Sequence, residues 1–254
     1  MKKCVTKPSL LLLALPLLLG LSQTLQARCD DPPAPRVNWS HCDKQGVDLS
    51  GADLSGAMMR NTRLDGANLE GALLTGADLS FANLEGARLA GLRMADARLL
   101  NAKLNDADLS GSLLNGSSFN RAELREADLS GASLRETNFY QARLDGANLE
   151  GALLQKAEMR QVVLDGANLA DAQMDEIDLR QASLEGANLR GAQLFRANLE
   201  GSKLHFADLR ETNLQRATLV NADLFQTRFE GSTLGGASWV DRRRCRMSSG
   251  DTCE

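Results

Sequence analysis

The sequence repeats every five residues, and this period restricts the fold more than any other feature. From Leu49 to Trp239, every position ending in 4 or 9 carries a large apolar residue, most often leucine. Two positions earlier, where the numbers end in 2 or 7, the residue is mostly alanine or another small residue. The phase does not slip anywhere in this range.

Neither a helix nor a straight strand can use a period of five. In a helix, each repeat would displace the leucine by about 140° and spread the leucines around the cylinder. In a straight strand, an odd period would place successive leucines on opposite faces. The pattern fits a short extended Ala-x-Leu segment, with its first and third side chains pointing inward, followed by two residues that turn a corner.

Four corners of about 90° close a coil of about 20 residues, and coils stack at the ~4.8 Å spacing of neighbouring strands. The twelve residues Arg63 to Leu74 recur letter for letter at Arg143 to Leu154, four such coils later. All but three of the 22 glycines occupy positions ending in 1 or 6, where a tight turn with positive φ favours glycine. We therefore predict an all-β solenoid of about ten coils.

The repeat also carries a recognisable motif. Residues 52–56, 67–71 and 147–151 read ADLSG, ANLEG and ANLEG. They resemble the A(D/N)LxG motif of pentapeptide-repeat proteins, and the resemblance covers residues 47–241 without interruption. It implies the fold of that family, a right-handed quadrilateral β-helix.

The first 27 residues have the features of a secretory signal peptide. Met1-Lys2-Lys3 precedes an apolar run, and the segment ends in small residues at Ala27. The run is too short to cross a bilayer. We expect an exported protein, periplasmic or secreted, with no membrane span after cleavage. Cleavage removes three lysines and no acid from 29 basic and 33 acidic residues, leaving a net charge of −7.

We expect a cap at each end of the solenoid, over residues 28–46 and 242–254, because terminal coils expose unpaired backbone. The mature chain keeps Cys29, Cys42, Cys245 and Cys253 in an oxidising compartment. About ten coils give a rod of ~47 Å, whereas bridged Cα atoms lie within ~7 Å. Cys29 should therefore pair with Cys42, and Cys245 with Cys253.

Residues of the predicted N-terminal cap also fit the register. Val37 and Trp39 fall on the two inward tracks, so the solenoid should begin in degenerate form near Val37. Trp39 and Trp239 should plug the core at opposite ends. His41 beside Cys42 permits a metal site with Cys29, but paired cysteines of exported proteins favour disulfides.

The sequence favours a non-enzymatic protein. It has two histidines, His41 and His205, and no phosphate-binding loop, CxxC pair or GxSxG elbow. A filled, straight prism also offers no concave pocket for catalysis. We predict no catalytic residues, no cofactor and no metal. A hydrolase that depends on His205 is the distant alternative.

One wall, centred on Met59, Leu79 and Leu99, mixes arginine, aromatic and amide groups at its corners. Protein interfaces favour this composition. We predict an interaction wall for an unknown protein partner, and the alternative is a solvated sheet face. The candidate residues are Arg60, Phe81, Arg121, Tyr140, Arg160 and Arg180. A second candidate patch, for self-association as a homodimer, consists of Phe195, Phe206 and Phe225.

Acidic residues concentrate on two neighbouring walls, and the four walls sum to a net charge of −9. The family resemblance suggests mimicry of DNA, by which some cytoplasmic members protect type II topoisomerases. Duplex DNA would present roughly 28 charges over this length, and export would separate the protein from gyrase. We predict a protein-binding or scaffolding rod in the cell envelope, with no nucleic-acid partner. An inhibitor or immunity protein acting by surface mimicry is the alternative, with topoisomerase protection if the protein is cytoplasmic.

Two further charged features, a polar column on the acidic wall and a basic cluster near the C-terminus, each permit more than one interpretation. A column before the leucines of the acidic wall, which includes Asn68, Asp108 and Asp128, predicts a side-chain hydrogen-bond ladder. Asp108 and Asp128 could instead hold a divalent cation. The basic cluster Arg242 to Arg246 fits a solvated cap, with anionic lipid or the acidic wall of another copy as alternatives.

Overall fold

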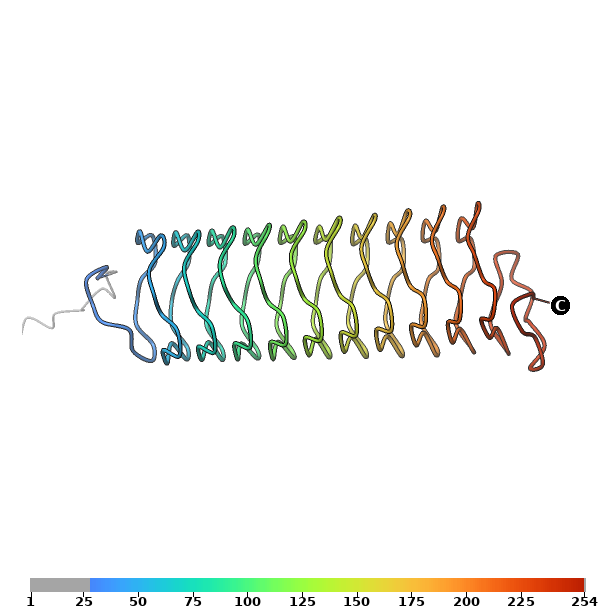
Figure 1. Ribbon diagram of the computed structural model, residues 1–254, viewed down its shortest axis with the longest axis horizontal. Helices are drawn as coiled ribbons and strands as arrows, with labels where there is room; N and C mark the ends of the chain where they lie inside the picture. The colour runs from blue at the N-terminus through green and yellow to red at the C-terminus, as the bar shows by residue number, and fades with distance from the viewer. Residues whose placement is uncertain (1–27, 254) are drawn as a thin grey trace, which may run out of the picture.

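The computed structural model describes residues 28–253 and shows a rod of stacked coils (Figure 1). Residues 28–253 contain no helix and no strand longer than a single bridge residue, so no helix there could span a membrane. Apart from one antiparallel bridge in the C-terminal cap, the β structure consists of isolated parallel bridges between residues twenty apart, from Asn38↔Met58 to Thr218↔Ser238. The predicted all-β coil of 20 residues is confirmed. The predicted signal peptide, residues 1–27, lies outside the described residues.

Backbone hydrogen bonds connect each coil to the next. The amide of Leu49 donates to the carbonyl of Asn68 at 2.7 Å, and the amide of Asn68 donates to the carbonyl of Val47 at 2.9 Å. Most corners are closed by a bond within their own coil, as between the amide of Ala52 and the carbonyl of Leu49 at 3.0 Å. The backbone polar groups of a side are therefore paired above and below, as a buried wall requires.

The corners have the backbone conformation that the glycine positions predict. Corner residues at positions ending in 1 or 6 have φ between 52° at Asn101 and 76° at Gly231. This left-handed conformation is strained for residues with a Cβ and unstrained for glycine. The chain therefore bends at the positions ending in 1 or 6, as predicted from the glycines.

The inward tracks form one continuous apolar core. Their alanines and leucines are buried along the rod, and the rings of Phe119 and Phe139 stack at 4.8 Å between centroids. Serine and threonine also fit the small track because their hydroxyls bond to nearby carbonyls. Thr62 donates to the carbonyl of Trp39 at 2.7 Å, and Ser112 donates to that of Leu89 at 2.8 Å. Each fully buried leucine contributes roughly 1.5 to 3 kcal/mol before entropic costs.

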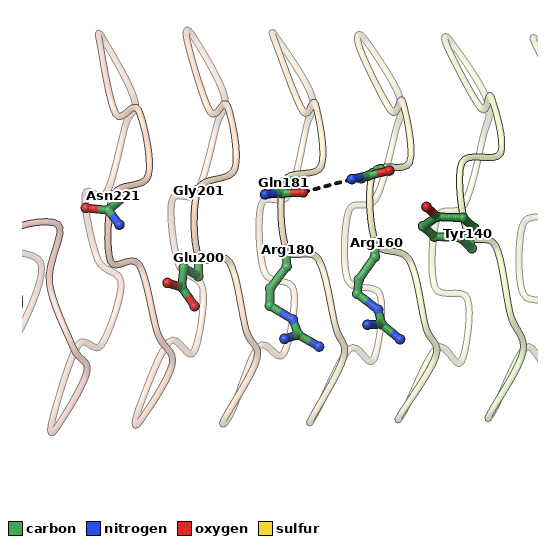
Figure 2. A pocket seen from close by; sticks show the side chains of 8 residues that line it. Tyr140, Arg160, Arg180, Gln181, Glu200, Gly201 and Asn221 are labelled. Atoms are coloured by element: carbon green, nitrogen blue, oxygen red, sulfur yellow. Dashed lines mark hydrogen bonds between the residues drawn. The ribbon is translucent and has the colours of Figure 1, made fainter.

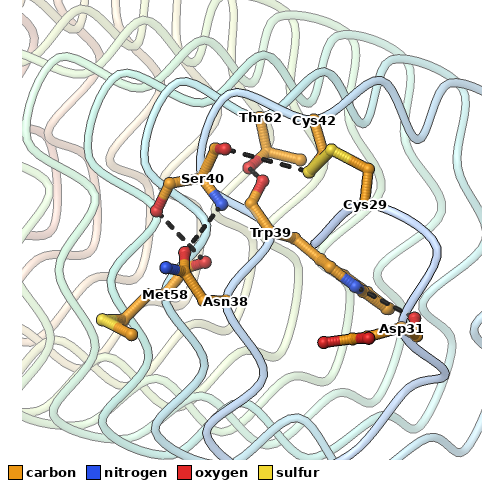
Figure 3. The surroundings of a disulfide bond; sticks show 8 residues. All are labelled: Cys29, Asp31, Asn38, Trp39, Ser40, Cys42, Met58 and Thr62. Atoms are coloured by element: carbon orange, nitrogen blue, oxygen red, sulfur yellow. Dashed lines mark hydrogen bonds between the residues drawn. A yellow bond between two sulfur atoms is a disulfide. The ribbon is translucent and has the colours of Figure 1, made fainter. Parts of the chain in front are cut away.

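A disulfide and a tryptophan close the N-terminal end (Figure 3). Cys29 is bonded to Cys42, with their Cα atoms 5.3 Å apart. The Trp39 side chain is fully buried and its Nε1 donates to the carbonyl of Asp31 at 3.2 Å. The first bridge is at Asn38, so the coil register begins next to Val37 as predicted.

The last segment of the chain folds over the C-terminal coil. Ser238 pairs with Arg244 in an antiparallel bridge, and the amide of Gly236 donates to the carbonyl of Cys245 at 3.1 Å. Cys245 is bonded to Cys253 with a Cα separation of 4.8 Å. Trp239 is only partly buried and packs on Phe229 at 5.6 Å. Both predicted cysteine pairs are present in the structure.

Candidate functional site: an arginine and glutamine edge

The predicted interaction residues lie along one corner of the rod. This corner follows the side whose bridges run from Asn38↔Met58 to Thr218↔Ser238. We name its outward residues the Arg–Gln edge. They are Arg60, Phe81, Leu100, Arg121, Tyr140, Gln141, Arg160, Gln161, Arg180, Gln181, Glu200, Gly201 and Asn221. The twenty-residue register places all six predicted residues on this edge.

A ladder of side-chain hydrogen bonds runs along the edge. Arg121 Nε donates to Gln141 Oε1 at 3.0 Å. Gln141 Nε2 donates to Gln161 Oε1 at 2.8 Å. Gln161 Nε2 in turn donates to Gln181 Oε1 at 2.9 Å, which is the dashed line at Gln181 in Figure 2. The side chains are therefore held in one orientation across four coils, which lowers the entropy that a partner would have to remove on binding.

The arginines of the edge are oriented by an aspartate of the preceding side. Arg180 makes a two-point contact with Asp178, with Nε to Oδ1 at 2.9 Å and a terminal nitrogen to Oδ2 at 2.7 Å. Arg160 Nε lies 3.3 Å from the same carboxylate. Burial opposes ionisation of Asp178, but the hydrogen bonds and charges of these arginines hold its pKa below the usual range. The Arg160 and Arg180 side chains stay 47% and 42% exposed, so they can also contact a partner.

A shallow groove of about 620 Å³ lies on this edge (Figure 2). Three predicted residues line it: Tyr140, Arg160 and Arg180. Arg60, Phe81 and Arg121 lie on the same edge, nearer the N-terminus and outside the groove. The six candidate residues did not include the other five lining residues, although their spacing in steps of twenty could have identified them: Gln161, Gln181, Glu200, Gly201 and Asn221.

The edge differs from the other corners in its backbone. Its left-handed residues are almost all non-glycine: His41, Asn61, Phe81, Asn101, Arg121, Gln141, Gln161, Gln181 and Asn221, with Gly201 as the exception. At the opposite corner, whose turn residues run from Gly51 to Gly231, only Asp171 and Glu211 are not glycine, and the two remaining corners mix glycine with other residues. A left-handed residue with a Cβ costs roughly 1 to 2 kcal/mol. Strain of this kind clusters at functional sites.

The predicted phenylalanine patch is only partly assembled. The rings of Phe206 and Phe225 meet edge-on at 5.8 Å, and the residues are 55% and 58% exposed. Phe195 does not join them. It lies half a coil away in the register, at the opposite corner, where the guanidinium groups of Arg196 and Arg216 lie 5.5 and 5.9 Å from its ring. The self-association surface is therefore reduced to Phe206 and Phe225.

His205 lies beside this pair and between two carboxylates. Its Nδ1 is 3.4 Å from Glu185, and its Nε2 contacts Asp223. The hydrogen bond to Asp223 raises the pKa of His205, and the charges of Asp223 and Glu185 act in the same direction. In the chain from Arg28 to Cys253, no group of three or more His, Cys, Asp or Glu residues could hold a metal ion.

The predicted ladder of the acidic wall is present. Asn68 Nδ2 donates to Asp48 at 3.0 Å, and Asn148 Nδ2 donates to Asp128 at 3.1 Å. The column continues with Asn168 Nδ2, which donates to Asn148 Oδ1 at 3.2 Å, and Asn188 Nδ2, which donates to Asn168 Oδ1 at 2.9 Å. Neutral amide side chains are thus interspersed with carboxylates in this column. Asp128 accepts hydrogen bonds from Asn148 Nδ2 and from the backbone amide of Ser130.

The sequence of the whole rod matches a known family. The profile described as pentapeptide repeats matches in eight copies, over overlapping segments from 36–71 to 202–238. The chain belongs to the pentapeptide-repeat family. Its fold is accordingly the right-handed quadrilateral β-helix. No curated protein sequence matches this family member significantly.

Several solved structures resemble this pentapeptide-repeat protein. HetL of Nostoc sp. strain PCC 7120, described as involved in heterocyst differentiation regulation, is 32% identical over 83% of this chain and 92% of its own, with a TM-score of 0.40. A trypsin-treated form of QnrB1, a plasmid-mediated fluoroquinolone resistance protein, is 20% identical over 75% of this chain and 88% of its own, with a TM-score of 0.47.

Proposed function

We propose that this pentapeptide-repeat protein is an exported, non-enzymatic rod that binds a protein partner in the cell envelope through the Arg–Gln edge. The observation that carries the proposal is the edge itself, where strained non-glycine residues display aligned side chains beside a groove. Glycine at these turns would relieve the strain but would remove the side chains. Retaining large polar side chains at such turns favours a surface used for recognition.

The chemistry of the groove supports a partner with carbonyl and carboxylate groups. Arg160 and Arg180 present half-exposed guanidinium groups, and Tyr140 adds an aromatic ring that is 37% exposed. Arginine and tyrosine are enriched among the residues that dominate interface energies. The glutamine ladder offers further donors and acceptors at the coil spacing.

The mimicry alternative has less support. A DNA-like surface requires a continuous line of unpaired negative charge. On the acidic wall, Glu70 contacts Arg88, and Asp208 contacts Arg210 and lies 3.8 Å from Arg228. A supercoiling assay with a type II topoisomerase tests this alternative directly. We expect the mature protein to leave supercoiling unchanged.

The absence of enzymatic activity is also part of the proposal. His205 is paired with Glu185 and Asp223, which gives it an ion-pairing role. A hydrolase built on His205 would lose its activity in His205→Gln. We expect no hydrolysis by either protein in a screen of ester, amide and glycoside substrates.

The test of binding is capture of the partner from the exported fraction by purified mature protein. The double variant Arg160→Ala with Arg180→Ala should reduce capture about tenfold or more, as expected for truncated interface arginines. Arg93→Ala is the matched control, since Arg93 is exposed on another side of the rod. Equal capture by the double variant and the control would reject the edge as the binding surface.

A further inference from the structure

We propose that the C-terminal cap contains a binding site for phosphate groups. A second groove of about 610 Å³ lies where the cap meets the last coils, on a different corner from the Arg–Gln edge. Its lining includes four arginines and no acidic residue: Arg196, Arg216, Arg244 and Arg246, with Gly236, Cys245 and Met247. Guanidinium groups match phosphate in charge and in paired hydrogen-bond geometry.

The coil register supplies two of the arginines. Arg196 and Arg216 are the turn residues of successive coils on one corner. Both guanidinium groups lie against the ring of Phe195, at 5.5 and 5.9 Å from its centroid. Contact with the ring restrains both guanidinium groups beside the groove.

Gly236 occupies the next position in this column and leaves room for the cap. A Cβ there would lie 3.0 Å from Met247 Sδ, and a Cβ on Gly235 would lie 2.7 Å from the carbonyl oxygen of Met247. The amide of Gly236 donates to the carbonyl of Cys245, and Cys245 is bonded to Cys253. The two glycines therefore allow the cap to pack closely against the last coil. This packing places Arg244 and Arg246 in the same groove as Arg216.

The positive charge of this groove is largely uncompensated. Arg196 is 3.4 Å from Glu176. Between Arg28 and Cys253, no carboxylate forms an ion pair with Arg216, Arg244 or Arg246. Like charges that share a groove repel one another, and a bound anion reverses the sign of that interaction. By contrast, Arg243 of the same basic run is already paired with Asp241 at 2.6 Å.

The groove is open to solvent, so it can receive a phosphate from a soluble molecule or from a lipid headgroup. Two probes distinguish these sources: inorganic pyrophosphate, measured by titration calorimetry, and phosphatidylglycerol vesicles, measured by flotation against phosphatidylcholine vesicles. Binding of either probe supports the site and names its source. Failure of the mature, disulfide-bonded protein to bind either probe would overturn the proposal.

The matched variants are Arg216→Gln with Arg246→Gln, and Arg242→Gln with Arg243→Gln. Each pair removes the same charge, but only the first changes the groove lining. We expect the first pair to weaken binding at least tenfold and the second to change it less than twofold. Equal losses would show attraction to general positive charge and would reject the site. Non-reducing peptide mapping of Cys245 to Cys253 checks that both variants keep the cap.

Discussion

At the scale of single residues, the left-handed turn residue affects both the stability of the fold and which side chain the corner presents to solvent. Gly111 has φ of 62°, and an added Cβ would meet no atom within 4 Å. Gly111→Ala should therefore lower the free energy of unfolding by about 1 kcal/mol through backbone strain alone. Phe81→Gly, on the Arg–Gln edge, removes such strain and should leave stability unchanged or raise it. Urea unfolding of both variants tests this, and a loss of stability in both would contradict the strain argument.

His205 gives a second prediction at the residue scale. Its pKa is raised from the ordinary 6.5, mainly by the hydrogen bond to Asp223, and the pKa of Asp223 is lowered from 3.8, mainly by the bond from His205. Lys203 and Glu185 are the other nearby charges. The raised pKa of His205 adds stability below pH 6.5, and this is lost as pH rises through the folded value. The lowered pKa of Asp223 adds stability above pH 3.8, and this is lost as pH falls through its folded value.

The measurement is the difference in melting temperature between the wild type and His205→Gln. We expect a larger difference at pH 5.5 than at pH 8.5, because the stability that the protonated imidazole adds is lost as pH rises. The same difference at both values would mean that the ion pairs contribute nothing measurable.

At the scale of structural elements, the caps protect the ends of the solenoid. The Cys29 to Cys42 bond closes a loop over Trp39, with a sequence separation of 13. Loops of this size are stabilised by about 3 kcal/mol when crosslinked. Cys29→Ser with Cys42→Ser, in a Trp239→Phe background, should expose Trp39 to acrylamide quenching at lower urea concentrations than global unfolding requires. Quenching that coincides with global unfolding would show that the cap does not open independently.

Most of the elements could be predicted from the sequence because five-residue periodicity fixes which side chains point inward. The same register predicts the corner, the amide ladders and the common edge of Arg60 and Tyr140. It could also have separated Phe195 from Phe206, since their positions differ by about half a coil. The arginine groove of the cap could not be predicted, because residues after Val240 leave the register and their contacts depend on tertiary packing.

At the scale of the whole molecule, the groove depends on coils remaining in phase. Deleting residues 162–166 keeps the five-residue core pattern but moves Arg180 to a different corner from Arg160. We expect the deletion protein to stay folded by circular dichroism and to lose partner capture. Deleting residues 82–86 is the matched control, because it shifts coils on the N-terminal side of the groove only. Loss of capture in both proteins would indicate that binding uses the rod as a whole.

Contact between the Arg–Gln edge and an exported partner can be measured by site-specific photo-crosslinking in intact cells. A photoreactive residue replaces Gln161 in one protein and Arg93, on another side, in a second. We expect a discrete crosslinked species with an exported protein from position 161 and none from position 93. Equal crosslinking from both positions, or crosslinks only to cytoplasmic proteins, would contradict it.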